Sequence, residues 1–332
     1  MDAQMKAIVC TKYGPPEVLQ LAQVEKPVPK DNEVLVKVHA ASVNKADWIM
    51  MRGKPFLVRL AGFGLLKPRN RIPGADVAGR VEAVGKDVKQ LKPGDEVFGD
   101  LAQWGLGGFA EYVCAHEDAL AVKPVNITFE EAAAVPMSAL TALQGLRKGK
   151  IQPGQKVLIN GASGGVGTFT VQIAKSFGAE VTAVCSTRSL DVARSIGADH
   201  VVDYTQEDFT KNGQHYDLII AANGYQPISA YKRALSPKGI YVMTGGSGAQ
   251  MVQAMFLGPL ISKIGSKKMG SLSDMKPNKE DYAFLRGLLE AGKIVPVIDR
   301  RYPLSQVPEA LRYLGEGHAR GKIVITVEHN KT

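Results

Sequence analysis

Residues 160–167 read NGASGGVG, so four of these eight residues are glycine, in a G-x-x-G-x-x-G spacing. Glycine allows a tight turn and lets backbone amides come very close to a phosphate. The apolar residues 157–160 before it predict a buried strand, and residues 165–177 predict a helix. The N-terminus of that helix would offer N–H groups and the positive end of the helix dipole. This order of strand, glycine turn and helix predicts a dinucleotide-binding turn instead of a turn that is merely tight.

The alternation of strands and helices continues outward from this turn. Short apolar runs predict strands, and apolar residues at helical spacing predict helices. The expected strands are 157–160, 181–185, 200–204, 217–222 and 239–245, and the expected helices are 165–177, 189–196 and 227–235. Apolar strands that alternate with helices predict a parallel sheet covered on both faces, which is a doubly wound Rossmann arrangement of the α/β class.

The first part of the chain has a different pattern. Short alternating runs such as EVLVKVHA (33–40) are separated by turn signals, which predicts a mostly β domain. The tail returns to this pattern around an expected helix near 279–291. The expected domains are a β domain from 1–128 and 275–332 and a dinucleotide-binding domain from 129–274.

The composition is that of an ordinary folded protein. The chain has 332 residues, of which 45% are hydrophobic and 22% charged, and this length predicts about two domains. Cys10, Cys114 and Cys185 are far apart and odd in number, which indicates free thiols in a reducing compartment. We find no run that could span a membrane and no secretory leader, so we expect a cytoplasmic protein.

The formal net charge of +9 has more than one interpretation. Such charge attracts nucleic acid, acidic lipids and small polyanions such as dinucleotide phosphates. The compact basic cluster SKIGSKK (262–268) is too short for a nucleic-acid-binding stripe and is more typical of a solvated face. We therefore do not expect a nucleic-acid partner.

The second strand of the alternating region indicates which dinucleotide binds. Cofactors without a 2′-phosphate are usually held by Asp or Glu at the end of this strand, about 20 residues past the glycines. Here Ser186, Thr187 and Arg188 stand at that place. Hydroxyls and a guanidinium favour a 2′-phosphate, so we expect NADPH instead of NADH. Alternatively, Thr187 and Ser189 cap the next helix while Arg188 is solvated, and the two interpretations are compatible.

Motifs along nearly the whole chain resemble those of one enzyme family. They are HAASVNKADW (39–48), IPGADVAGRVEAVG (72–85), KPGDEVFG (92–99), VPMSALTAL (135–143), NGASGGVGTFTVQIAKSFGAEVTAV (160–184) and GHARGKIVITV (317–327). Together they are similar to the medium-chain dehydrogenase/reductase superfamily, in its zinc-independent quinone oxidoreductase branch (the zeta-crystallin-like group). The resemblance implies a GroES-like β domain joined to a Rossmann domain, and a homodimer.

The resemblance also implies where zinc ligands would stand in the zinc alcohol dehydrogenases of this superfamily. Asn44 occupies the place of a cysteine, residues 75–76 (Ala-Asp) that of a His–Glu pair, and residues 137–138 lie near that of another cysteine. Of these expected ligands only the carboxylate of Asp76 could survive, and zinc needs about four N, S or O ligands, so we expect no metal. His39 and His116 remain as possible ligands, although a lone histidine in a β domain is more often structural or exposed.

Without zinc, alcohol oxidation would lack its Lewis acid, and hydride delivery to a conjugated acceptor is the easier reaction. The resemblance implies an NADPH-dependent reductase whose substrate is a quinone or a small lipophilic α,β-unsaturated carbonyl compound. It places Asn44 near the nicotinamide and the substrate, where its amide would donate to a developing oxyanion. Lys45 and Arg52 are weaker candidates for this role. Alternatively, Asn44 is only a turn residue that closes the strand 34–43.

Further cofactor contacts are expected at strand ends. Ligands of open α/β sheets sit beyond the carboxyl ends of strands, where Asn223, Gly245 and Gly246 stand, although these could be ordinary turns. By resemblance, Tyr204 flanks the adenosine phosphate, unless it is a sheet-edge aromatic, and Thr141 lies near the pyrophosphate or nicotinamide. The predicted cofactor-binding residues are Thr141, Gly164, Gly165, Val166, Gly167, Ser186, Thr187, Arg188, Tyr204, Asn223, Gly245 and Gly246.

Two apolar stretches, 55–66 and 251–261, are richer in apolar residues than a connection requires. Each could form the lipophilic wall of an acceptor pocket or pack into the core or a subunit contact, and for 251–261 we favour the second interpretation. Residues 267–273 could pair edge to edge in the expected homodimer.

Two other functions remain open. The same fold could be an alcohol or aldehyde dehydrogenase with unusual ligands, or a non-enzymic NADPH-binding protein with a structural or RNA-binding role. Zinc content would identify the first, and cofactor binding without turnover would identify the second.

Overall fold

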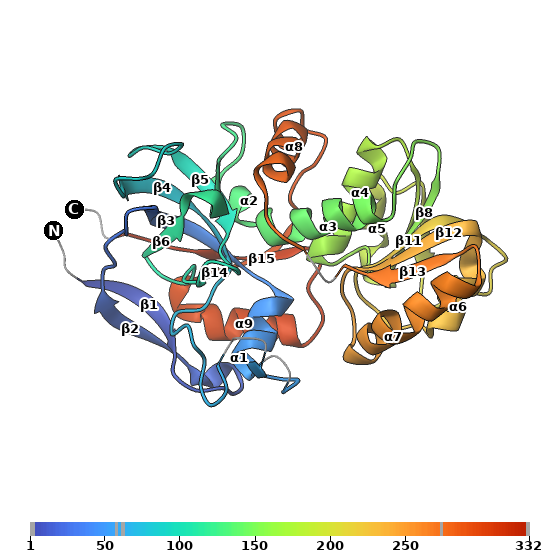
Figure 1. Ribbon diagram of the computed structural model, residues 1–332, viewed down its shortest axis with the longest axis horizontal. Coiled ribbons are helices and arrows are strands. Elements are labelled where there is room, and N and C mark those ends of the chain that lie inside the picture. The colour runs from blue at the N-terminus through green and yellow to red at the C-terminus, as the bar shows by residue number, and fades with distance from the viewer. Residues whose placement is uncertain (1–3, 57–58, 61–63, 273–274, 330–332) are drawn as a thin grey trace. The chain divides into compact units, whose positions relative to one another are not determined.

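The computed structural model describes residues 4–56, 59–60, 64–272 and 275–329, and Figure 1 shows its elements. Contacts between residues divide the chain into two compact units. Unit 1 comprises Met1–Met137, Pro277–Glu290 and Ile298–Thr332, and unit 2 comprises Ser138–Lys276 and Ala291–Val297. The domain boundaries expected from the sequence, near 128 and 275, stay predictions about domains that fold on their own.

Unit 1 is mostly antiparallel β structure, as its alternating sequence predicts. Its larger sheet has the strand order β14-β15-β3-β4-β5-β7, and β6 also pairs with β3; β1 and β2 form a separate hairpin. Its strands are β1 (Gln4–Cys10), β2 (Leu19–Glu25), β3 (Glu33–Val43), β4 (Asp76–Val84), β5 (Glu96–Asp100), β6 (Tyr112–His116), β7 (Leu120–Val122), β14 (Ile298–Pro303) and β15 (Lys322–Thr326).

The helices of unit 1 pack against this sheet through apolar side chains. They are α1 (Lys45–Arg52), α2 (Phe129–Ala133), α8 (Lys279–Glu290) and α9 (Val307–Gly315), and α3 (Pro136–Lys148) begins here and continues in unit 2. Val36 and Val38 of β3 share a buried core with Met51 of α1 and Leu311 of α9. Because this core holds the end of β3 against α1, it positions Asn44 between them.

The helix α8 is attached to the sheet by a buried tyrosine. Tyr282 is 2% exposed, its ring meets Phe98 of β5 edge to face at 5.7 Å, and its hydroxyl accepts from the backbone N–H of Asp100 at 2.9 Å. The same hydroxyl donates to the carbonyl of Ala119 at 3.5 Å. One side chain thus joins the helix to two adjacent segments of the sheet.

Unit 2 is built on a parallel sheet with the strand order β10-β9-β8-β11-β12-β13. All pairings in this sheet are parallel within the described residues. The strand order reverses between β8 and β11. The helices α4 and α5 connect β8, β9 and β10, whereas α6 and α7 connect β11, β12 and β13, and Figure 1 shows these two pairs on opposite faces of the sheet. The elements are β8 (Lys156–Asn160), α4 (Gly165–Ser176), β9 (Glu180–Cys185), α5 (Leu190–Ser195), β10 (His200–Asp203), β11 (Tyr216–Ala221), α6 (Ile228–Ala234), β12 (Leu235–Met243), α7 (Gly248–Ile264) and β13 (Lys268–Ser271).

The predicted α/β alternation of this half is confirmed, and α7 is an addition to it. Residues 251–261 carry apolar side chains on all sides of the helix, so the sequence shows no amphipathic period to reveal it. Within the described residues, no helix is long and apolar enough to cross a membrane.

Replacing Tyr282 by Phe tests the attachment of α8. The ring can still pack on Phe98, but the N–H of Asp100 loses its acceptor in a buried place, so we expect a loss of about 1–3 kcal/mol of unfolding free energy. Denaturant unfolding measures this loss. Tyr225→Phe is the control, because Tyr225 is 51% exposed, and it should change stability by less than about 0.5 kcal/mol. Equal stability of both variants would contradict the attachment.

Candidate functional site

Unit 1 contains a buried polar cluster at the ends of neighbouring strands. Asn44, Asp76 and Lys322 lie at its centre and are 6%, 0% and 3% exposed. The Lys322 ammonium donates to Oδ1 of Asn44 at 2.6 Å and to Oδ2 of Asp76 at 3.2 Å. Nδ2 of Asn44 donates to the same oxygen of Asp76 at 2.9 Å. The three side chains therefore form a closed triangle of hydrogen bonds.

The register of the sheet brings these residues together although they are far apart in the chain. Lys322 begins β15, and the antiparallel pairing of β15 with β3 places it opposite Asn44. Asp76 begins β4 and pairs with Ser42 of β3, whose hydroxyl donates to Oδ2 of Asp76 at 2.8 Å. The backbone N–H of Met137 donates to the other oxygen of Asp76 at 3.0 Å.

The orientation of the Asn44 amide follows from its neighbours. A lysine ammonium can only donate and an ionised carboxylate can only accept, so the amide oxygen must face Lys322 and the amide nitrogen must face Asp76. An amide nitrogen carries two N–H groups, and the bond to Asp76 uses one of them. The cluster therefore fixes the orientation of the Asn44 amide. Because the amide is planar, the N–H that is bonded to Asp76 also sets the direction of the second N–H.

Two further carboxyl groups lie near this cluster and are fully buried. Asp100 of β5 is the register partner of Asp76, and Asp47 accepts from the backbone N–H of Asn44 at 2.8 Å. Burial raises the pKa of Asp47 to about 7, and the charge of Asp76 adds to this effect; the pKa of Asp100 is raised for the same two reasons. Among the described residues, Oδ1 of Asp47 and Oδ2 of Asp100 have no hydrogen-bond partner. Both groups therefore favour the neutral form below about pH 7.

The residues of this cluster do not fit a zinc ion. Both oxygens of Asp76 already accept hydrogen bonds, and the Lys322 ammonium occupies the position beside them that a cation would take. Within the described part of the chain, no group of three or more His, Cys, Asp or Glu residues could hold a metal. The absence of metal from the purified protein stays a prediction, which metal analysis can test.

Lys45 and Arg52, the other predicted catalytic residues, lie at a different place on α1. Both cations approach the ring of Trp48, at 5.8 Å for Nζ of Lys45 and 5.1 Å for the guanidinium carbon of Arg52. Burial and the neighbouring Arg52 lower the pKa of Lys45. The structure thus groups these two residues with Trp48 and places Asn44 in the buried cluster. Their catalytic roles stay predictions.

The glycine turn of unit 2 has the geometry that close phosphate binding requires. Gly161 has a φ of 82°, which favours glycine, and Gly164 precedes α4 as its N-cap in an extended conformation. A Cβ on Gly167 would lie 2.1 Å from the carbonyl oxygen of Gly161, so only glycine lets the helix pack this closely on the strand end. The first N–H groups of a helix have no partner inside it. Those of Gly165 and Val166 therefore fit a pyrophosphate.

Two further loops meet this turn at the carboxyl ends of the strands. The carbonyl of Asn160 accepts from the N–H of Asn223 at 3.2 Å, and a Cβ on Gly161 would lie 2.7 Å from the nitrogen of Asn223. Gly245 donates to the carbonyl of Ala221 at 3.1 Å. The structure thus brings Asn223 and the Gly245–Gly246 loop to the same sheet edge as the glycine turn.

Thr141 reaches the same edge through α3. It is 8% exposed and lies one helical turn before Gly145, on the same face. A Cβ on Gly145 would lie 2.6 Å from the methyl group of Thr244, in the loop after β12. This face of α3 therefore packs on the loop that carries Gly245.

The residues predicted to select the cofactor meet at the ends of β9 and β10. Tyr204 is 61% exposed, and its N–H donates to the carbonyl of Cys185, next to Ser186. Thr187 donates through its hydroxyl to Asp203 at 2.5 Å, and this bond is the largest cause that lowers the pKa of Asp203. The hydroxyl proton of Thr187 is therefore engaged. Ser186 and Arg188 lie in the same segment, next to the ionised Asp203, and their role in binding a 2′-phosphate stays a prediction.

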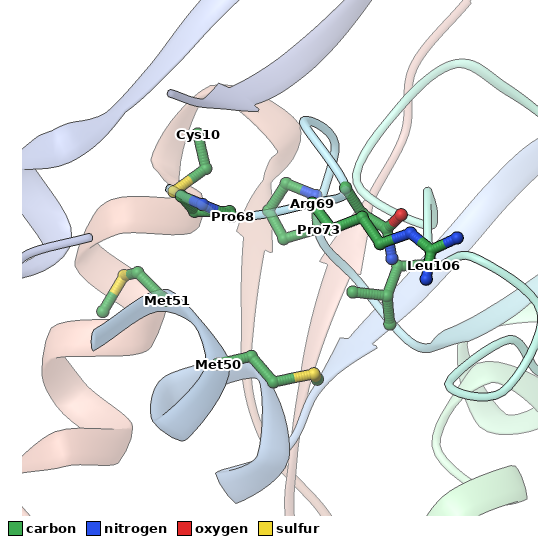
Figure 2. A pocket seen from close by; sticks show the side chains of 8 residues that line it. Cys10, Met50, Met51, Pro68, Arg69, Pro73 and Leu106 are labelled. Carbon is green, nitrogen blue, oxygen red and sulfur yellow. The ribbon is translucent and has the colours of Figure 1, made fainter. Parts of the chain in front are cut away.

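A small pocket of unit 1 lies next to α1. Met50 and Met51 of that helix line it together with Cys10, Arg69 and Leu106 (Figure 2). Its volume of about 30 Å³ is room for about two water molecules. It is therefore too small to be the acceptor site.

The two apolar stretches are largely exposed where the structure describes them. In 55–66, Phe56, Leu60, Leu65 and Leu66 are at least 52% exposed, whereas 57–58 and 61–63 lie outside the described residues. In 251–261, two residues, Ala254 and Gly258, are buried. Packing into the core is therefore wrong for most side chains of 251–261, because only one narrow stripe of α7 faces the sheet. The other part of that interpretation, a subunit contact, stays a prediction.

Sequence reasoning missed three charged residues at these sites. Lys322 stands in the motif GHARGKIVITV, but a lysine before an apolar strand gives no sign that it is buried. Asp203 precedes Tyr204 and was overlooked because only the end of β9 was searched for a carboxylate. Asp47 stands three residues after Asn44, which is the spacing of a helix-capping carboxylate, and this signal could have been found.

Comparisons with known proteins agree with this architecture. A family model described as alcohol dehydrogenase GroES-like domain matches residues 30–125, and one described as zinc-binding dehydrogenase matches residues 196–325. The solved structure of the quinone oxidoreductase from Coxiella burnetii matches with a TM-score of 0.87 at 30% identity, covering 98% of this chain and 100% of that one. The predicted combination of a GroES-like β domain and a Rossmann-like domain is confirmed.

Curated relatives cover nearly the whole chain. The chain is 36% identical to the chloroplast envelope quinone oxidoreductase homolog of Arabidopsis thaliana, over 97% of this chain and 98% of the relative. It is 33% identical to the chloroplastic NADPH-dependent alkenal/one oxidoreductase of the same plant, over 97% of this chain and 79% of the relative. Both names place those relatives in the chloroplast, and the cytoplasmic location expected for this chain stays untested.

Replacing Lys322 by Met tests the buried pair. The Asp76 carboxylate would remain buried without its cation, so we expect a loss of about 3–5 kcal/mol of unfolding free energy. Adding Asp76→Asn should recover part of this loss, with a coupling of about 1–3 kcal/mol in the double-mutant cycle. Denaturant unfolding of the four proteins measures it.

Lys123→Met is the matched control for this cycle. Lys123 is also buried, but its ammonium donates to the carbonyls of Pro124 and Ile127 and pairs with Glu96 at 3.1 Å, so its partners do not include Asp76. The losses of unfolding free energy from Lys123→Met and Asp76→Asn should therefore be additive in the double variant. Additive losses for Lys322 and Asp76 would show that the pair does not act as one unit.

The raised pKa of Asp47 predicts how stability depends on pH. Below about pH 4 the Asp47 carboxyl is protonated in both the folded and the unfolded protein. Between about pH 4 and pH 7 it ionises in the unfolded chain but stays protonated in the folded one, so the free energy of unfolding falls as pH rises. Asp47→Asn should weaken this fall. Between pH 4 and pH 8 the variant should lose up to about 4 kcal/mol less unfolding free energy than the wild type does. Thermal unfolding across this range measures the effect.

Asp191→Asn serves as the comparison for this titration, because the Asp191 side chain is fully exposed on α5. Its pH profile should follow that of the wild type. If Asp47→Asn also leaves the slope between pH 4 and pH 7 unchanged, Asp47 does not titrate as described.

Proposed function

Since the chain belongs to the medium-chain dehydrogenase/reductase superfamily, in its quinone oxidoreductase-like group, we propose that it is an NADPH-dependent, zinc-free reductase of quinones or α,β-unsaturated carbonyl compounds. The coarser assignment, an NAD(P)H oxidoreductase of the quinone and enone reductase group, follows from relatives with these names. The observation that carries the finer proposal is the buried cluster, in which the Lys322 ammonium takes the place of a metal cation beside Asp76 and the Asn44 amide donates to the same carboxylate.

The donor set of this cluster supports reduction of an already polarised acceptor. Both oxygens of Asp76 are hydrogen-bonded, so the cluster offers no Lewis acid to activate an alcohol. A quinone or enone is polarised by its own conjugation and needs mainly a hydrogen-bond donor for the oxygen that becomes negative. The amide of Asn44 is such a donor.

The neighbours of Asn44 make it a better donor than a free amide. Lys322 donates to its carbonyl oxygen at 2.6 Å, and a hydrogen bond to the oxygen of an amide strengthens donation by its nitrogen. Asp76 holds the other N–H, so the amide cannot rotate. Asn44 would therefore place its second N–H on the acceptor oxygen, and water would supply the proton that completes the reduction.

The strand ends of unit 2 supply the proposed cofactor site. Bound NADPH would provide the hydride for the reaction. The N–H groups of Gly165, Val166 and Gly167 would hold its pyrophosphate, and Ser186 and Arg188 would bind its 2′-phosphate. A homodimer and a cytoplasmic location remain part of the proposal without a direct observation.

Steady-state assays of the full chain test the proposed function. NADPH oxidation is followed with a short enone, a para-quinone and a saturated aldehyde, with and without a chelator. We expect turnover with the enone or the quinone, none with the aldehyde, and no effect of the chelator. Aldehyde reduction together with about one tightly bound zinc per chain would support an alcohol dehydrogenase, and tight NADPH binding without turnover would support a non-enzymic protein.

Asn44→Ala should lower kcat for the enone or the quinone by about 10²–10³-fold, because it removes a donor to the developing oxyanion. The Kd for NADPH should stay within about twofold of the wild-type value, which also reports that the variant is folded. Asn126→Ala is the control, since Asn126 donates to the carbonyl of Leu289 at 3.0 Å and has no proposed role at the site. A kcat for Asn44→Ala equal to that of the control would remove Asn44 from the mechanism.

Arg188→Ala should raise the Kd for NADPH by about 10–100-fold and leave the Kd for NADH within about twofold, because a charge-assisted bond to the 2′-phosphate is lost. Calorimetric titration with both cofactors measures the two constants. Arg194→Ala is the control, because Arg194 pairs with Asp191 on the exposed side of α5. If Arg188→Ala raised the Kd for NADH as much as that for NADPH, Arg188 would not select the cofactor. If the wild type bound NADH more tightly than NADPH, Asp203 and not Arg188 would select it.

A further inference from the structure

The helix α7 presents an apolar surface that the proposed reaction does not use. Its buried stripe consists of Gln250, Ala254 and Gly258, which are spaced by four residues. The stripe is attached to β13 through Ser262, whose hydroxyl accepts from the N–H of Met269 at 2.8 Å. Ile261 is partly buried against the core of unit 2. Seven large apolar side chains of the helix are 43–89% exposed, and they are Met251, Val252, Met255, Phe256, Leu257, Leu260 and Ile264.

This exposed surface is unusual for a folded protein in water. Single exposed apolar residues are common, but a contiguous group on one element marks an interaction surface. The helix carries no charge before Lys263. The seven exposed apolar side chains named above cover most of the circumference of the helix, and we call them together the α7 ridge.

The charge around the α7 ridge has one sign. Residues 218–273 contain no Asp or Glu, and their cations are Lys232, Arg233, Lys238, Lys263, Lys267 and Lys268. Nζ of Lys267 donates to the carbonyl of Lys232 at 2.7 Å, which joins the C-terminal end of α6 to the segment after α7. Burial and the charge of Lys232 lower the pKa of Lys267. The apolar ridge is thus bordered by a basic cluster.

We propose that the α7 ridge and the lysines at its C-terminal end dock this protein on the surface of an anionic lipid bilayer. An exposed apolar helix with lysines at one end can lie in the interface plane, where its apolar side chains enter the acyl boundary and the cations meet acidic headgroups. With 17 residues, α7 is about 25 Å long and suits this orientation. The proposal goes beyond the reductase activity and does not depend on it.

The sign of the charge favours a membrane over a second copy of the chain. In a twofold contact through the ridge, the same patch of each copy faces its counterpart, so Lys263, Lys267 and Lys268 would approach their own kind without an acidic partner in 218–273. An anionic bilayer instead neutralises each of these cations, at about fivefold in affinity for each lysine near the surface.

Vesicle flotation of the full chain tests the proposal. Vesicles of neutral phosphatidylcholine are compared with vesicles that also contain phosphatidylglycerol, at low and at about 1 M salt. We expect binding to the anionic vesicles at low salt, release at high salt because charges are then screened within about 3 Å, and at least tenfold weaker binding to neutral vesicles. Equal binding to both lipids, or no binding, would overturn the proposal.

Two sets of variants separate the basic cluster from the ridge. Lys263→Gln, Lys267→Gln and Lys268→Gln together should weaken binding to anionic vesicles by about 100-fold. The control set removes the same charge in unit 1 through Lys12→Gln, Lys89→Gln and Lys92→Gln, all exposed, and should bind as the wild type does. Equal weakening by both sets would mean that net charge alone causes binding.

The ridge is tested by Phe256→Ser, Leu260→Ser and Ile264→Ser together, which should weaken vesicle binding by about tenfold or more. Its control is Val28→Ser, Leu66→Ser and Val125→Ser, three residues of unit 1 that are at least 83% exposed. Sedimentation of all variants without lipid reports self-association. A dimer that the ridge variant dissociates, without vesicle binding by the wild type, would identify a second copy as the occupant and overturn the proposal.

Discussion

The buried contact between the Lys322 ammonium and the Asp76 carboxylate is the constraint on which the candidate site depends. Both groups are removed from water, and such a pair is tolerated only when the remaining donors and acceptors are also satisfied. Ser42, the N–H of Met137 and the amide of Asn44 satisfy the carboxylate. The same bonds hold the first residues of β4 and β15 against the end of β3. Structure and site chemistry therefore rest on one set of hydrogen bonds.

The parallel sheet of unit 2 and the antiparallel sheet of unit 1 were predictable because each has a local signature. Strand–helix alternation and the spacing of glycines lie within short windows of sequence, and the glycine turn was located together with the strand and helix that it joins. The triangle of Asn44, Asp76 and Lys322 could not be found in this way. Its members are 32 to 278 residues apart in the chain and meet only through strand register, which no local pattern encodes.

Sequence pattern also failed where a helix lacks two distinct faces. The apolar residues of α7 surround the helix axis, so the usual period that marks a surface helix is absent. The side chain that anchors its N-terminal turn is Gln250, a polar residue that donates to Tyr241 at 2.9 Å inside unit 2. Pattern reasoning assumes that the apolar side chains of a surface helix are buried and its polar ones exposed. In α7 a polar side chain is buried and most of the large apolar ones are exposed, which only the structure reveals.

The acid-free stretch 218–273 has a consequence for the motion of the molecule in solution. It supplies six of the nine net positive charges within 56 of the 332 residues. Charge of one sign so concentrated produces a local positive potential, and an approaching polyanion is attracted to this part of unit 2 before contact. Rotational diffusion is then biased, and the region around α6 and α7 turns toward any negative surface first.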